Sequence, residues 1–175
     1  MTAPKLGKLG KPDRDSADVK RILLGFLDYY RSVIANKVAG LSDDDLRRSR
    51  LPSGWTPIQL VKHLAFMERR WFRWGFLAEP VDEPFGDEDD AGNWLVDTDE
   101  PVADLLAALH AGGATTRVIV ERADLSDVAA AGGRFSETDV RPTLVWILAY
   151  VVQEYARHAG HLDVARELID HVVGE

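Results

Sequence analysis

The stretch EYARHAGHLDVARE, residues 154–167, has the spacing of an amphipathic helix, and its first eight residues contain one carboxylate and two imidazoles. Residues three or four positions apart lie on the same face of a helix, one turn from each other. At about 100° per residue, His158 falls inside the apolar stripe, while Glu154 lies one turn before it and His161 about one turn after it. The sequence therefore predicts a helix from about Pro142 to His171 whose polar groups converge on one point. Its stripe consists of Leu144, Leu148, Val151, Tyr155 and Leu162.

A second helix with an inward-facing histidine is predicted from Pro57 to about Leu77. Thr56 is a suitable N-cap, and Pro57 suits the first turn because the N–H that it lacks has no helical partner there. His63 lies at the edge of the buried face of this helix. The apolar stripe comprises Leu60, Leu64, Met67, Trp71 and Trp74.

Two further helices complete the predicted fold. Apolar residues recur every three or four positions from Ser16 to about Ala39, and again from Pro101 to about Val120, where Gly112 and Gly113 predict a kink. An acidic, proline-containing connection precedes Pro101. Short links favour antiparallel neighbours, whereas this long connection allows the second and third helices to run parallel. The sequence thus predicts an all-α protein, a four-helix bundle with an up-down-down-up course.

The composition is typical of one soluble domain. The chain has 175 residues, 46% of them hydrophobic and 29% charged, and we assign residues 1–15 to a flexible N-terminal arm and residues 16–175 to the domain. Apolar runs such as LVWILAYVV, residues 144–152, are shorter than the roughly 20 residues of a membrane span, so we expect no membrane segment. The net charge of -8, without a strong basic cluster, argues against a nucleic-acid partner. The arm lacks the apolar core of a secretion signal, which favours a cytoplasmic protein.

The inward-facing polar groups need partners, because burying imidazoles and a carboxylate alone costs several kcal/mol. A divalent cation is one such partner. Imidazole nitrogens and a carboxylate oxygen suit Zn²⁺, Ni²⁺, Mn²⁺ or Fe²⁺, and three protein ligands leave positions open for water or substrate. The alternative is a hydrogen-bonded core histidine beside an ordinary surface pair of Glu154 and His158.

Two stretches together resemble the signature helices of the DinB-like superfamily, and more closely its actinobacterial branch with mycothiol-dependent enzymes. They are GWTPIQLVKHLAFMERRWF, residues 54–72, and EYARHAGHLDVARELID, residues 154–170. The resemblance covers nearly the whole chain after the arm. It implies a DinB-like bundle with the up-down-down-up course and a metal held by His63, Glu154 and His158.

Three residues near these ligands are not part of the family's metal motif. We expect His161 to support a ligand by hydrogen bonding, with service as an alternative ligand if Glu154 turns away. Tyr150 stands where many relatives carry a histidine, and Val145 where they carry an arginine. These two departures imply either altered substrate handling or a member that has lost activity.

The resemblance implies a metal-dependent transferase that activates a low-molecular-weight thiol, mycothiol or a similar compound, for attack on an electrophilic small molecule, or else a thiol-dependent isomerase. The chain has no cysteine, so the thiol must come from a co-substrate. The alternative is a non-catalytic bundle that binds a small ligand or dimerises; a homodimer is compatible with either reading. The candidate substrate pocket is lined by Met67, Trp71, Trp94 and Tyr150.

Two surface features allow a functional and a plain interpretation. The acidic connection is either a lid, with Phe85 and Trp94 covering the open coordination side, or a solvated loop. Arg69, Arg70 and Arg157 flank the ligand helices, where they either bind an anionic thiol or form surface ion pairs.

Overall fold

The computed structural model describes residues 10–173, so residues 1–9 of the predicted arm and the last two residues of the domain lie outside the described part. The long helices are α1 (Val19–Val38), α3 (Pro57–Arg69) with its continuation η1 (Arg70–Phe76), α4 (Val102–Arg122) and α5 (Leu144–Asp170), and α2 (Asp43–Arg47) is a short one. The β-structure of the described residues is limited to two isolated bridges. The predicted all-α class is confirmed. Within residues 10–173 no helix combines the length and the apolar character that crossing a membrane requires.

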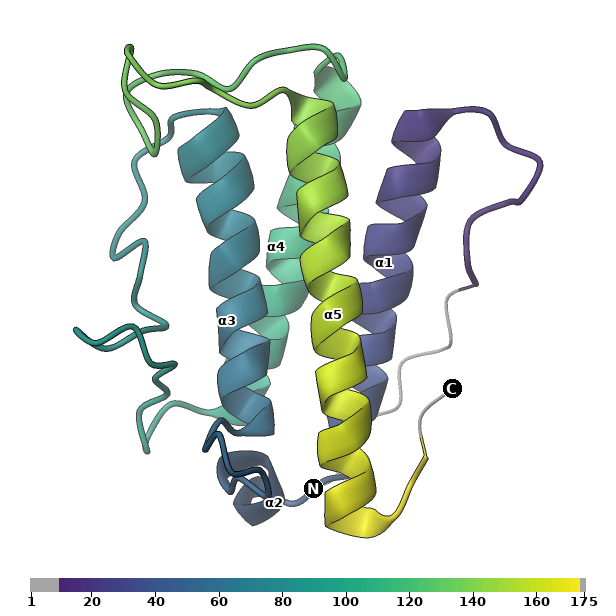
Figure 1. Cartoon of the computed structure of the whole chain (residues 1–175), viewed down its shortest axis with the longest axis vertical. Helices are drawn as coiled ribbons and strands as arrows, with labels where there is room; N and C mark the ends of the chain where they lie inside the picture. The colour runs from purple at the N-terminus through teal and green to yellow at the C-terminus, as the bar shows by residue number, and fades with distance from the viewer. Residues whose placement is uncertain (1–9, 174–175) are drawn as a thin grey trace.

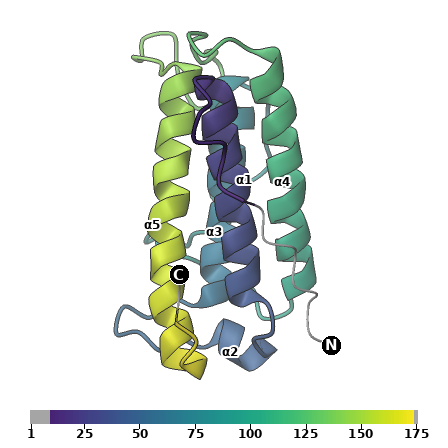
Figure 2. The same cartoon turned by 90° about the vertical axis from the view of Figure 1, so that its right-hand side faces the viewer.

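The long helices stand side by side as a bundle. In Figure 1 the chain runs down α1, up α3, up α4 and down α5, and the connection between η1 and α4 returns along the outer side of α3. A quarter turn shows α1 between α4 and α5, with α3 behind it (Figure 2). The helix that carries His63 therefore packs against α4 and also contacts α5, which carries Glu154 and His158.

Local sequence signals set the start of α3 as predicted. The backbone N–H of Gln59 donates to Thr56 Oγ1 at 3.3 Å, and Gln59 Oε1 accepts from the Thr56 N–H at 2.8 Å. This reciprocal capping box, with Pro57 in the first turn, satisfies backbone donors that the helix leaves free. His63 follows less than two turns later, so its height along the bundle is fixed by this cap.

The C-terminal part of the second predicted helix departs from α-helical geometry. From Arg70 to Phe76 the chain forms a π-helix, and the Leu77 N–H reaches the Phe72 carbonyl at 3.1 Å. A π-helix widens the turn, so the side chains after Arg70 point in directions that α-helical spacing does not predict. In this register the buried guanidinium of Arg70 meets the acidic connection at Asp87.

The two glycines at which a kink is predicted do not interrupt α4, which continues through both as one helix. A Cβ atom on Gly113 would lie only 2.8 Å from Cδ and Nε of Arg31, whereas one on Gly112 would meet nothing within 4 Å. Gly113 thus allows the buried Arg31 side chain of α1 to pass close to the α4 backbone. The first glycine of the pair has no such contact.

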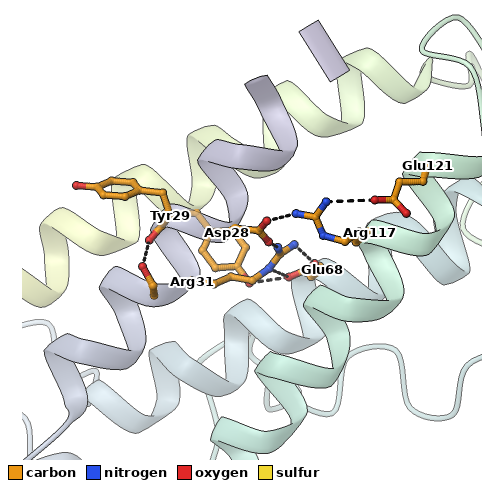
Figure 3. A network of polar contacts seen from close by, with 8 residues as sticks. Asp28, Tyr29, Arg31, Glu68, Arg117 and Glu121 are labelled. Carbon is orange, nitrogen blue, oxygen red and sulfur yellow. Dashed lines mark hydrogen bonds and ion pairs between the residues drawn. The ribbon is translucent and has the colours of Figure 1, made fainter. Parts of the chain in front are cut away.

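Arg31 belongs to a network of ion pairs that crosses the core (Figure 3). Its guanidinium donates to Glu68 through Nε at 3.2 Å and through Nη2, and to Asp28 through Nη1 at 2.8 Å. Tyr155 Oη donates to Glu68 at 2.7 Å. Buried charges are tolerated only when they are paired, so this network fixes how the long helices lie relative to one another. It extends to α4 through Arg117, which pairs with Asp28 and Glu121.

Candidate metal centre

The predicted ligands meet between α3 and α5. One ligand atom from each of His63, Glu154 and His158 lies within 4.8 Å of the other two. His158 Nε2 is 3.3 Å from Glu154 Oε2, and the rings of His63 and His158 are centred 5.2 Å apart at an angle of 71°. Ligand atoms that share a cation at bond lengths of about 2.1 Å lie roughly 3.5 Å apart. Small side-chain rotations would therefore close this group around an ion, and its donor set fits Zn²⁺ and similar divalent metals.

Asp87, in the acidic connection, fixes His63 and was not singled out from the sequence. Its side chain is fully buried, and Oδ2 lies 3.1 Å from His63 Nδ1. Arg70 donates to both carboxylate oxygens. Burial by itself raises the pKa of Asp87, but the hydrogen bonds from His63 and Arg70 outweigh it, so the pKa is lowered. An ionised Asp87 accepts the Nδ1–H of His63 and leaves Nε2 as the nitrogen available for a metal.

Asp87 also belongs to a second group of possible ligands, with His63 and Glu88. In that group both oxygens of Asp87 already accept hydrogen bonds from Arg70. A cation bound there would lie beside a guanidinium of the same charge, which is unfavourable at such short range. The group formed by His63, Glu154 and His158 is therefore the better metal site.

His158 is held in the neutral form that a metal ligand requires. Burial, followed by the positive charges of His63, His161 and Arg157, lowers its pKa from 6.5 to about 3. Its Nδ1 lies 3.3 Å from Nδ1 of His161. When His161 accepts that hydrogen bond, the His158 Nε2 lone pair points at Glu154 and toward His63.

Trp94 covers the imidazoles on the side of the acidic connection. Its ring stacks on His63 with centroids 4.4 Å apart and lies edge-on to His158 at 5.3 Å. Phe85, the second residue expected in a lid, instead contacts Trp74 and Arg70. A groove of about 390 Å³ runs outside Trp94 and is lined by Ser53, Gly54, Trp55, Gln59, Gly92, Asn93 and Trp94.

A family model described as Mycothiol-S-transferase matches residues 22–171. The chain belongs to the mycothiol-S-transferase family. The match runs from α1 to the end of α5 and includes His63, Glu154 and His158. The mycothiol-related family predicted from the two signature helices is thereby confirmed. No curated protein matches the chain at a significant level.

In this member of the mycothiol-S-transferase family, the other predicted pocket residues lie on the two ligand-bearing segments: Tyr150 on α5, Met67 on α3 and Trp71 on its continuation η1. Tyr150 is one turn before Glu154, and burial, then the charge and hydrogen bond of Glu154, raise the pKa of its phenol. Its ring is 4.8 Å from that of Trp71. Met67 and Trp71 are buried and belong to the hydrophobic core.

Two of the three arginines proposed for anion binding are occupied by the protein itself. Arg69 donates to the carbonyls of Asp82 and Glu83, and Arg70 pairs with Asp87. Arg157 is exposed on α5 beside His158. The guanidinium groups of Arg69 and Arg70 therefore bind the acidic connection rather than a ligand.

Proposed function

We propose that this chain is a metal-dependent thiol S-transferase, in which His63, Glu154 and His158 hold a divalent cation and a mycothiol-like thiol attacks an electrophilic small molecule. The observation that carries the proposal is the approach of two imidazoles and one carboxylate to within 4.8 Å of one another. Membership of the mycothiol-S-transferase family supports a thiol as the co-substrate. The chain has no cysteine that could take its place.

The residues present fit a divalent cation of the Zn²⁺ class better than an alkaline-earth ion, because two of the three donors are imidazole nitrogens. When bound, such a cation lowers the pKa of a thiol, so that a thiolate nucleophile is available near neutral pH. The side chains of Glu154 and His63 retain 14% and 13% exposure, against 6% for His158, so these two ligands are more accessible from outside than His158.

Neighbouring side chains have separate tasks in the proposed site. Asp87 orients His63, and His161 orients His158, through the Nδ1 atoms of the two ligands. Trp94 shields the imidazoles from water on the side of the connection. The protein thus contributes orientation and water exclusion, while the reacting groups belong to the substrates.

The bundle fits the DinB-like type with its up-down-down-up course. The directions of α1, α3, α4 and α5 in Figure 1 support this assignment, because the outer pair runs opposite to the inner pair along the chain. In such a course the second and fourth helices are antiparallel, so a ligand on one faces ligands on the other at the same height.

The test combines metal content with thiol consumption. The purified, untagged protein should retain about one divalent metal ion per chain, measured by elemental analysis. The His63→Ala and His158→Ala variants should retain less than roughly a tenth of this metal content, because each lacks one of the three proposed ligands. With mycothiol and monobromobimane as substrates, the rate of thiol conjugation above the spontaneous reaction should require the metal and disappear in both variants.

The matched control is His110→Ala, which removes an exposed histidine on α4. It should keep both the metal and the activity. Undiminished metal in the His158→Ala variant would disprove the ligand set. A full metal complement without thiol consumption would instead favour the non-catalytic, ligand-binding alternative.

A further inference from the structure

Arg134 presents a half-buried guanidinium without an acidic partner. No carboxylate between residues 10 and 173 forms an ion pair with it, whereas Arg31, Arg47, Arg70, Arg73, Arg117 and Arg166 all have one. Burial and the nearby charge of Arg70 lower the pKa of Arg134, so its environment disfavours the positive charge. A positive charge held in such surroundings attracts an anion from solution.

Backbone contacts hold Arg134 close to η1. Its N–H donates to the Trp74 carbonyl of η1 at 3.1 Å. The preceding residue, Gly133, approaches η1 so closely that a Cβ atom would lie 2.1 Å from the same carbonyl oxygen. Only glycine permits this approach, and it anchors the loop between α4 and α5 where the Arg134 side chain can lie over η1.

Aromatic side chains connect the guanidinium with the proposed metal site. It sits 4.2 Å above the Trp71 ring, and Trp71 in turn contacts Tyr150 at 4.8 Å. Tyr150 lies close enough to sense the charges of both Arg134 and Glu154. These contacts run from Arg134 through Trp71 and Tyr150 to Glu154, so two aromatic side chains connect this unpaired cation with a proposed ligand of the metal centre.

We propose that Arg134 binds a carboxylate group of the electrophilic substrate, next to the site where the thiol reacts. The planar guanidinium can form two parallel hydrogen bonds to a carboxylate, and its stacking on Trp71 keeps it oriented. Trp146, which is 50% exposed, stacks on Tyr150 with ring centroids 5.3 Å apart and an angle of 8°. These rings offer an apolar wall, so the substrate class is an organic acid with an apolar or aromatic body. This role of Arg134 in the reaction rests on the proposed transferase function.

The experiment compares an acid with its uncharged amide. Calorimetric titration of the metal-free protein with 3-phenylpropionate and with 3-phenylpropanamide should show that the acid binds roughly 10-fold more tightly or better, as expected for hydrogen bonds to a charged group. The Arg134→Gln variant should lose this preference, and Arg134→Lys should retain part of it, because lysine keeps the charge but not the fork. Arg73→Gln, a surface arginine of η1 paired with Glu79, is the matched control and should retain the full preference.

Three results would overturn the proposal: an unchanged preference in Arg134→Gln, equal binding of acid and amide by the original protein, and no binding of either compound at millimolar concentration. If circular dichroism shows that Arg134→Gln does not fold, an undiminished preference for the acid over the amide in Arg134→Lys would equally contradict the proposal. Repeating the titrations with Zn²⁺ detects an acid that binds only to the cation, which would also contradict the role of Arg134. Because the metal-free titrations need neither metal nor turnover, their failure is distinguishable from failure of the transferase proposal.

Discussion

Among the many acidic residues of the connection before α4, one differs from its neighbours by burial. Asp87 is fully buried, whereas Asp89 and Asp90 are exposed. Its two hydrogen-bond donors, His63 and Arg70, come from one helical segment, so Asp87 attaches the connection to the ligand helix. The carboxylate of Asp87 thereby connects an otherwise mostly exposed loop with His63 and orients the imidazole of this proposed metal ligand.

The Asp87→Asn variant should bind Zn²⁺ roughly 10- to 100-fold more weakly, because neutral asparagine stabilises the ligand tautomer of His63 less well than a carboxylate does. The affinity is measured by competition with a coloured chelator. Asp90→Asn, which removes an exposed charge from the same loop, should bind the metal with unchanged affinity. Equal affinities in the two variants would show that Asp87 does not support the ligand.

The lowered pKa of His158 predicts a specific pH dependence of stability in the metal-free protein. The unfolded chain takes up this proton near pH 6.5 and the folded chain only near pH 3, so stability should fall as the pH decreases between these values. Between pH 7 and pH 4.5 the loss from His158 alone is about 2 kcal/mol. Urea unfolding with a chelator present should therefore show a smaller loss in His158→Gln. The loss should stay the same in the control His110→Gln, and a His158→Gln variant as acid-sensitive as the original protein would refute the assignment.

At the scale of elements, α4 shows how one helix can carry two glycines with opposite roles. Glycine costs a helix interior up to about 1 kcal/mol relative to alanine. Gly113 compensates through the space that it leaves for Arg31, whereas Gly112 has no neighbour within 4 Å. The close packing of α4 on α1 around Arg31 thus depends on one missing methyl group.

Gly113→Ala should destabilise the protein by about 1 to 3 kcal/mol, because the new Cβ displaces a guanidinium held by Glu68 and Asp28. Gly112→Ala should have the opposite sign and stabilise by up to about 1 kcal/mol through helix propensity. Both values come from urea denaturation at neutral pH. Similar changes in the free energy of unfolding of the two variants would mean that Arg31 moves away from the new Cβ atom at little cost, which would contradict a tight contact with Gly113.

For the whole molecule, two sets of polar contacts join the helices. The Arg31–Glu68–Tyr155 network links α1, α3 and α5 through the core, and the proposed cation would add a second link between α3 and α5. Glu68 follows His63 on α3, and Tyr155 follows Glu154 directly on α5. The network therefore holds in register the two helices whose relative height sets the distances between the proposed metal ligands.

Added Zn²⁺ should raise the melting temperature of the metal-free protein. At a free concentration about 1,000 times the dissociation constant the gain is about 4 kcal/mol, which corresponds to roughly 10 °C for a chain of this size. Differential scanning calorimetry measures the shift. His63→Ala should melt at the same temperature with and without Zn²⁺, and an equal rise in that variant would place the bound metal elsewhere.

The sequence predicted the helices of the fold and the candidate site better than it predicted the loops. Apolar periodicity predicted the long helices to within a few residues, and the spacing of Glu154 and His158 put them on one face because helical geometry is local. Asp87, Arg134 and the stacking of Trp94 on His63 depend on how loops fold back onto the bundle, which no local pattern encodes. The sequence pattern also did not reveal why Gly113 stands within a continuous helix, because its contact with Arg31 is tertiary.

The separation of the ligands along the chain has a consequence for biosynthesis. His63 emerges from the ribosome long before Glu154 and His158, so a nascent chain that ends at Arg141 has one of the three donors and cannot enclose an ion. Metal acquisition by the proposed site would thus be coupled to docking of α5, which is synthesised after α1, α3 and α4. A ribosome-bound fragment without α5 should release Zn²⁺ to a mild chelator at once, whereas the chain that includes α5 should release it slowly.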